Sequence, residues 1–202
     1  MTISVIGQDM PPPSPPPPPS FRTAPTPSRP APPVVSENAP HGALLLELLV
    51  YSGAPFNDHW AYFIRSSSSP NTGVYIDAQG DVRNGFELQL KRDHDLLQDS
   101  PRPSLRIPLQ WIENRPTDEQ TTPDREHGMS DQLKPMSEFE RSVLKVEAPV
   151  KTLNTVTQTG LPRKVVQRNC QTWVVEAADQ LVEDGILHPD VAAYLHATKQ
   201  VM

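Results

Sequence analysis

Cys170 is the only cysteine among 202 residues, and it occupies a position where a thiol can act as a nucleophile. The segment RNCQTWVVEAADQLVED places it in the first turn of an expected helix, with Asn169 as the N-cap residue. Free backbone amides and the helix dipole stabilise a thiolate there. The same amides can hold the oxyanion that forms on an attacked carbonyl group. The pattern therefore makes Cys170 a candidate catalytic nucleophile.

A cysteine nucleophile needs a base, and His59 is the best placed of the six histidines. It begins the segment HWAYFIRS, whose alternation predicts a strand. Asp77 falls on the next expected strand, where its carboxylate could orient the imidazole and fix its tautomer. His94 is expected after the fourth strand, in a charged segment. Three more histidines lie in the tail, in a polar insertion and before the last helix: His41, His127 and His188.

Each candidate also has a structural interpretation. A single buried cysteine on a helix is usually a small hydrophobic residue, and a lone strand histidine is more often structural than catalytic. Asp77 can equally be a turn residue before Gly80. Three aromatic residues are either core residues or walls of a pocket: Trp60, Tyr62 and Trp173. No zinc-ligand spacing and no phosphate-binding glycine loop is present, so we expect neither a metal nor a cofactor.

The strands and helices that must position these residues are predicted within residues 43–202. Their order, strands first and helices later, predicts a single α+β domain. Residues 44–50 are expected to be a strand buried on both faces. Further strands are predicted at 59–66, 73–78 and 86–90, which complete an antiparallel meander on which the cysteine-bearing helix packs. Residues 105–112 also alternate, but Pro108 limits them to an edge or a bulge.

Helices are expected in the second half of the chain. A capping-box pattern at Ser137 opens a short helix, and the helix from Cys170 ends before Gly185. Its apolar face consists of Val174, Ala177, Ala178 and Leu181. A final helix runs from Pro189 to about residue 200, and residues 164–167 are a candidate short strand.

Residues 1–42 form a proline-rich tail that we expect to be disordered, and residues 117–135 a mobile polar insertion. The tail is either a spacer or a ligand for SH3-type or WW-type modules. A net charge of −6 without a basic cluster argues against nucleic acid or an anionic membrane as a partner. No stretch reaches the ~18 apolar residues of a membrane span. With one cysteine and no signal-peptide pattern, the sequence predicts a cytoplasmic or nuclear protein.

Three blocks, NDHWAYFIRS, GVYIDAQGDV and RNCQTWVVEAADQLV, together resemble the circularly permuted papain-like group, in which a histidine strand precedes the cysteine helix. NlpC-type and lecithin:retinol acyltransferase-like proteins have this order, with a second polar residue on the following strand. PPPDE-type deubiquitinating peptidases also place histidine before cysteine. The blocks HWAYF, IDAxGDVxNGF and CQTW more closely resemble a family of fungal domains of unknown function.

The resemblance implies that Cys170 is a nucleophile and His59 its base. Asp77 stands where the third polar residue falls, although the acyltransferase-like families often have a second histidine there. The implied activity is cysteine-dependent hydrolysis of peptide, isopeptide or other amide bonds. Two alternatives stay open: a non-catalytic interaction module with a recruiting proline-rich tail, and a thiol acyltransferase.

Overall fold

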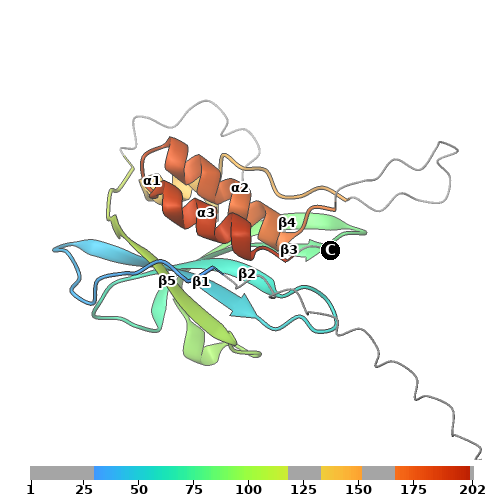
Figure 1. The fold of residues 1–202 in the computed structure, drawn as a ribbon, viewed down its shortest axis with the longest axis horizontal. Coiled ribbons are helices and arrows are strands. Elements are labelled where there is room, and N and C mark those ends of the chain that lie inside the picture. Colours follow the sequence, from blue (N-terminus) through green and yellow to red (C-terminus); the bar gives the residue numbers. More distant parts are fainter. Residues whose placement is uncertain (1–29, 118–132, 152–166, 201–202) are drawn as a thin grey trace, which may run out of the picture.

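The computed structural model describes residues 30–117, 133–151 and 167–200. Over these residues the protein is an antiparallel sheet of five strands with helices packed on one face (Figure 1). The strands are β1 (Ala43–Tyr51), β2 (His59–Arg65), β3 (Thr72–Asp81), β4 (Gly85–Asp95) and β5 (Leu105–Glu113). The helices are α1 (Glu138–Val143), α2 (Cys170–Glu183) and α3 (Pro189–Thr198), with a 3-10 turn at Leu96–Gln98. The expected mixed α+β architecture is confirmed.

The strand order β4-β3-β2-β1-β5 shows that the first four strands form the predicted meander. The chain then returns to the free side of β1, where β5 pairs with it. Pro108 lies opposite Glu47, and the register shifts beside this pair. A proline has no amide hydrogen to donate to a ladder, so an outer strand with a bulge is where it fits. The prediction for residues 105–112 is therefore confirmed.

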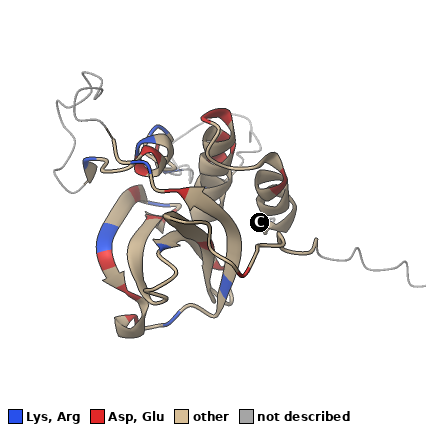
Figure 2. Ribbon diagram, turned by 90° about the vertical axis from the view of Figure 1, so that its left-hand side faces the viewer, with Lys and Arg blue, Asp and Glu red and all other residues tan. Residues whose placement is uncertain are grey.

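The fourth strand is longer than predicted. We expected it to stop near Leu90 and placed His94 in a segment beyond it, which was wrong, because β4 continues to Asp95 and His94 pairs with Gly73. The reason is that β4 is an outer strand, so its charged side chains can face water without breaking the ladder (Figure 2). The turn before β4 also falls later than predicted, since Asp81 still belongs to β3.

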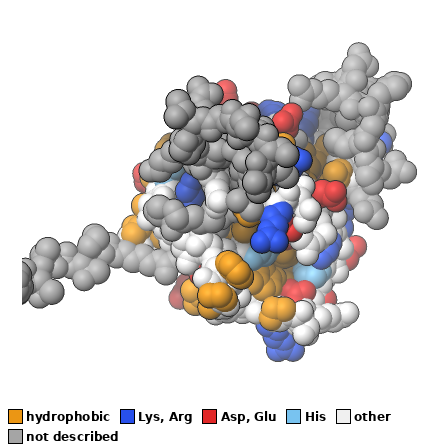
Figure 3. Space-filling view, turned by 90° about the vertical axis from the view of Figure 1, so that its right-hand side faces the viewer, with side chains coloured by type: hydrophobic (Ala, Val, Ile, Leu, Met, Phe, Trp, Pro, Cys, Tyr) orange, Lys and Arg blue, Asp and Glu red, His pale blue; other side chains and the backbone are white. Residues whose placement is uncertain are grey.

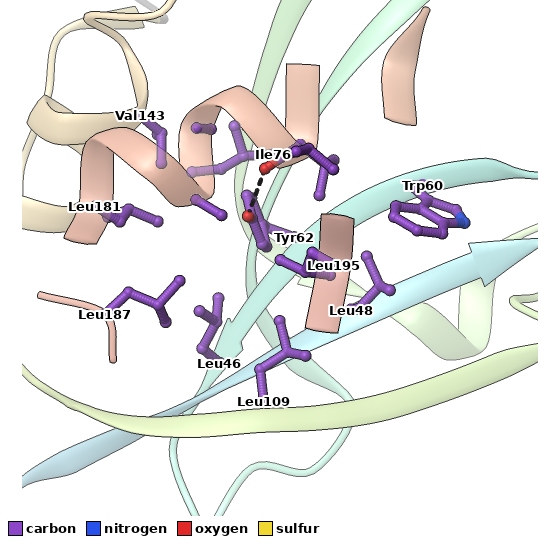
Figure 4. Packing of buried hydrophobic residues seen from close by; sticks show 14 of the residues in the cluster. Leu46, Leu48, Trp60, Tyr62, Ile76, Leu109, Val143, Leu181, Leu187 and Leu195 are labelled. Atoms are coloured by element: carbon purple, nitrogen blue, oxygen red, sulfur yellow. Dashed lines mark hydrogen bonds between the residues drawn. The ribbon is translucent and has the colours of Figure 1, made fainter. Parts of the chain in front are cut away.

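The main core lies between the sheet and the helices. Alternate residues of β2, Trp60, Tyr62 and Ile64, face the helices and are buried. The hydroxyl of Tyr62 donates a hydrogen bond of 2.7 Å to the carbonyl of Val174 in α2 (Figure 4). Trp60, Tyr62 and Trp173 are at most 1% exposed, so they are core residues rather than pocket walls. The predicted apolar face of α2 is confirmed, because all four of its residues belong to this cluster.

The opposite face of the sheet carries a smaller buried cluster. It consists of Leu49, Ala61, Phe63, Tyr75 and Leu96. The alternation of β2 gives His59 the same facing as Ala61 and Phe63, as the sequence predicts. His59 is the first residue of β2, so it stands at the end of the sheet rather than in its middle.

The helix ends follow the expected chemistry. The side chain of Asn169 accepts a hydrogen bond of 3.0 Å from the amide of Thr172, and Ser137 caps α1 in the same way at 3.2 Å. Gly185 follows α2 with a φ of 72°, a conformation that glycine adopts without strain. Pro189 begins α3 as predicted, and this helix ends at Thr198.

Part of the tail is described. Residues 30–42 form neither helix nor strand, and the indole nitrogen of Trp111 donates a hydrogen bond of 2.8 Å to the carbonyl of Ser36. The rest of the tail (1–29), most of the predicted insertion (118–132) and most of the candidate strand at 164–167 lie outside the described residues. In the part of the chain that the structure describes, no helix combines the length and apolar character needed to cross a membrane.

The packing of α2 predicts a large cost for Leu181→Ala. Leu181 is fully buried in the main core, and a leucine truncated to alanine at such a site destabilises a protein by about 2–5 kcal/mol. Leu97→Ala is the matched control, because that leucine is 54% exposed. Urea unfolding of both variants gives the comparison. Equal losses of unfolding free energy would contradict the assigned core.

Candidate active site

His59 and Asp77 are brought together by the pairing of β2 with β3. Asp77 lies opposite Ala61 in the ladder, so its side chain and that of His59 project from the same face. The Nε2 atom of His59 lies 2.8 Å from Oδ2 of Asp77. The carboxylate is buried, with 3% of its side chain exposed, whereas the imidazole is 33% exposed. The pair thus has one end fixed inside the fold and the other at the surface.

Cys170 joins this pair from α2. It is the first residue of the helix, is 7% exposed and lies within hydrogen-bonding reach of the His59 ring. Because Nε2 of His59 is held by Asp77, Nδ1 is the nitrogen that is left for the thiol. The structure therefore brings together the three residues that the sequence singles out: a thiol, an imidazole and a carboxylate.

The electrostatics of the site favour a charged imidazole. Burial disfavours the imidazolium form, but hydrogen bonds to Asp77 and Cys170, together with the negative charges of both, outweigh it. The net effect raises the pKa of His59 to about 9. At neutral pH the ring therefore carries a proton on each nitrogen, one directed to the carboxylate and one available to the sulfur or to a leaving group.

Tyr75 is part of the site and was missed by sequence reasoning. Its hydroxyl donates a hydrogen bond of 2.9 Å to Oδ2 of Asp77 and lies 3.5 Å from Nε2 of His59. Burial, and then the charge of Asp77, raise the pKa of Tyr75 well above its usual value, so the group remains a donor. The sequence does hold a signal, because Tyr75 precedes Asp77 by two residues and so shares its face of β3.

The start of α2 provides backbone donors beside the thiol. Of the amides in the first turn, that of Thr172 is taken by the Asn169 side chain and that of Trp173 by the Asn169 carbonyl. The remaining amides of this turn belong to Cys170 and Gln171. An oxyanion formed next to the sulfur would meet these two donors and the positive end of the helix dipole.

The other described histidines are engaged elsewhere. His94 packs its ring on Tyr75 at 5.0 Å, and its Nε2 lies 2.9 Å from Oδ1 of Asp99 without the alignment of a hydrogen bond. His188 caps α3, and His196 contacts Asp179 on the surface. His41 precedes β1, and His127 lies outside the described residues. Among the described histidines, the choice of His59 agrees with its contact to Cys170.

Figure 3 views the molecule from the end at which β3 finishes, and hydrophobic side chains gather there beside a histidine. In the loop between β1 and β2, Phe56 is 83% exposed only three residues before His59. This loop therefore presents an exposed aromatic ring to the solvent.

Comparison with known proteins shows the family of this chain. Residues 46–188 match the sequence model of a Family of unknown function (DUF6540), and the chain belongs to that family. The matched range contains His59, Asp77 and Cys170. No curated protein and no solved structure matches the chain.

The charge balance at His59 predicts the effect of Asp77→Asn. Replacing the carboxylate weakens the hydrogen bond to Asp77, which is the largest cause of the raised pKa, and removes the smaller effect of its charge, while burial still disfavours the imidazolium. We therefore expect NMR titration of the His59 ring to give a pKa near 9 in the wild type and a lower value in the variant.

Asp99→Asn is the matched control for this titration. Asp99 contacts His94 and Tyr51, and it is not among the groups that shift His59. The pKa of His59 should be the same in this variant as in the wild type. An unchanged value in Asp77→Asn would show that the carboxylate does not hold the charge of the ring.

Proposed function

We propose that this protein is a cysteine-dependent hydrolase of peptide, isopeptide or other amide bonds, with a circularly permuted papain-like fold. One observation carries the proposal: the His59 imidazole lies between a buried carboxylate and a thiol at the start of a helix. A nucleophile, a base and a group that orients the base are the components that thiol catalysis of acyl transfer requires.

In the first half of the reaction, the Cys170 thiolate attacks the substrate carbonyl carbon and a carbon–sulfur bond forms. The carbonyl electron pair moves to the oxygen, and the amides of Cys170 and Gln171 stabilise that oxyanion. The intermediate collapses as the carbon–nitrogen bond breaks, and the imidazolium of His59 gives its proton to the departing amine. A thioester and a neutral imidazole remain. The raised pKa of His59 suits this step, because a proton must be available at neutral pH.

In the second half, the neutral His59 ring takes a proton from water while the water oxygen attacks the thioester carbon. The carbon–sulfur bond breaks, releasing the carboxylic acid product and regenerating the thiolate–imidazolium pair. Asp77 holds the ring in one orientation throughout by its hydrogen bond to Nε2, and Tyr75 in turn holds the carboxylate. Activity should therefore fall as the pH rises through about 9, where His59 loses its proton.

The order of the elements supports the papain-like assignment. The histidine strand β2 comes first, the strand β3 with the third residue follows, and the cysteine helix α2 comes last. This is the order of the permuted papain-like group, which the sequence blocks resemble. A catalytic cysteine also has to stay reduced, which fits a cytoplasmic or nuclear location, and the proline-rich tail fits recruitment by SH3-type or WW-type modules.

Alkylation of Cys170 by iodoacetamide tests the pair directly. In the proposed pair the imidazolium of His59 stabilises the Cys170 thiolate at neutral pH, so His59→Ala should lower the alkylation rate. A thiol with the pKa of ~8.5 of a free cysteine is only about 3% thiolate at pH 7, so the expected loss is roughly thirtyfold. Asp77→Asn should lower it less, because the imidazole remains. Mass spectrometry of the intact protein measures the rates, and Cys170→Ala gives the background. A thiol that is equally reactive without His59, or unreactive until the protein unfolds, would identify Cys170 as core packing.

An acyl electrophile with an amide-like leaving group then separates the alternative functions. Release of free acid indicates hydrolysis, and capture by an added amine indicates a thiol acyltransferase. A protein that binds the reagent without forming the thioester in the presence of intact Cys170 and His59 would be an interaction module. Product analysis by mass spectrometry distinguishes these outcomes.

A further inference from the structure

We propose that three polar side chains, Asp58, Gln171 and Gln200, form a clamp that sets the distance between the proposed nucleophile and its base. In this clamp the side chains of Gln171 and Gln200 have a positioning role: they act through their neighbours and do not touch the substrate. The inference rests on the proposed function and adds to it the hydrogen bonds that hold Cys170 at a fixed distance from His59.

Gln171 forms the buried centre of the clamp. It directly follows Cys170 and is fully buried, which is rare for a glutamine. Its Nε2 donates hydrogen bonds of 2.7 Å to the carbonyl of Asp58 and 2.7 Å to Oε1 of Gln200. Its Oε1 accepts one of 2.8 Å from the amide of Gln200. Both of its amide hydrogens and its oxygen are therefore used.

Gln200 closes the clamp from the residues that follow α3. Its Oε1 also accepts a hydrogen bond of 2.7 Å from the amide of Asp58, and its Nε2 lies 3.1 Å from Oδ2 of Asp58. The other carboxylate oxygen, Oδ1, accepts the amide of Gly53 at 3.1 Å. Three segments that are distant in sequence thus meet here: the loop between β1 and β2, the start of α2 and the residue after the α3 cap.

The clamp acts on the site because its members adjoin the reacting residues. Asp58 directly precedes His59, and Gln171 directly follows Cys170. The hydrogen bond between them therefore fixes the start of α2 against the start of β2. A misplacement of about 1 Å at a reacting pair can lower a rate 10²-fold, so loosening this bond should slow the thiol chemistry.

A donor–acceptor swap between Asp58 and Gln200 tests this role. Gln200→Glu places two carboxylates at a contact of 3.1 Å, and Asp58→Asn places two amide groups there. The double variant restores one donor and one acceptor and keeps the net charge. The asparagine introduced in the loop can still accept from the amide of Gly53. The glutamate introduced after α3 can still accept from the backbone amide of residue 58 and from the side chain of Gln171.

We expect each single variant to alkylate Cys170 more slowly than the wild type, by roughly threefold to tenfold at pH 7 and less than His59→Ala, and the double variant to regain most of the rate. Lys199→Ala is the matched control, because Lys199 adjoins Gln200 and its side chain is outside the clamp. Thermal unfolding of all variants separates positioning from general destabilisation. Positioning changes the rate in variants that stay folded at the assay temperature, and the swap reverses that change.

Two results would overturn the clamp. Single variants that are folded and alkylate as fast as the wild type would show that the hydrogen bonds do not position the thiol. Single variants that lose rate without recovery in the swap would show that the loss comes from general damage to the fold. The His59→Ala variant, measured alongside, tests the proposed function separately. If its alkylation rate equals that of the wild type, the proposed function is wrong, and the positioning role of the clamp is wrong as well.

Discussion

The charge of Asp77 is the constraint on which the site depends. A carboxylate that is 3% exposed has lost its hydration, and such a group is stable only with a counter-charge or strong donors at contact distance. Tyr75 and the imidazolium of His59 provide these donors at 2.9 and 2.8 Å. The carboxylate thus fixes the orientation and the protonation of the ring, and through the ring it determines what Cys170 can do.

The sheet contains a second buried carboxylate, and its counter-charges come from arginines instead of a histidine. Glu47 is buried on the sheet face that is turned away from the helices. Arg65 and Arg106 pair with it from the neighbouring strands at 3.2 and 2.5 Å. Arginine is a permanent cation that matches a carboxylate with its planar fork of donors, so the partners of Glu47 do not release a proton. At Asp77 the partner is a histidine, whose proton can leave. The difference between these two buried carboxylates lies in the partner that each has, and at Asp77 that partner is a group whose pKa is about 9.

The alternation of HWAYFIRS was sufficient to predict β2 and the face on which His59 lies, because side chains alternate in any strand. Asn169 was sufficient to place Cys170 in the first turn of α2, because capping is a local interaction. The length of β4 could not be predicted in this way. Its charged residues resemble a loop unless it is known that the strand lies at the edge of the sheet.

The clamp is also invisible in the sequence. Gln171 meets residues 58 and 200, which are 113 and 29 positions away, and amide hydrogen bonds over such separations leave no periodic pattern. The sequence was sufficient to select Asp77 as a candidate, but its burial could not be predicted. Burial depends on how the chain packs on the sheet face that is turned away from the helices. Residue types and local periodicity therefore identify the candidates, and only the tertiary fold shows which of them are in contact.

The exposure of the three residues bears on whether they serve function or stability. A cysteine that only fills space packs among apolar side chains. Cys170 instead lies close enough to the His59 ring, which is 33% exposed, to contribute to its raised pKa. From Asp77 to His59, burial decreases along the line of hydrogen bonds, so the ring is held from inside while part of it reaches the boundary of the fold. The function proposed above uses this exposed part of the ring, because a substrate carbonyl would have to approach the sulfur beside it.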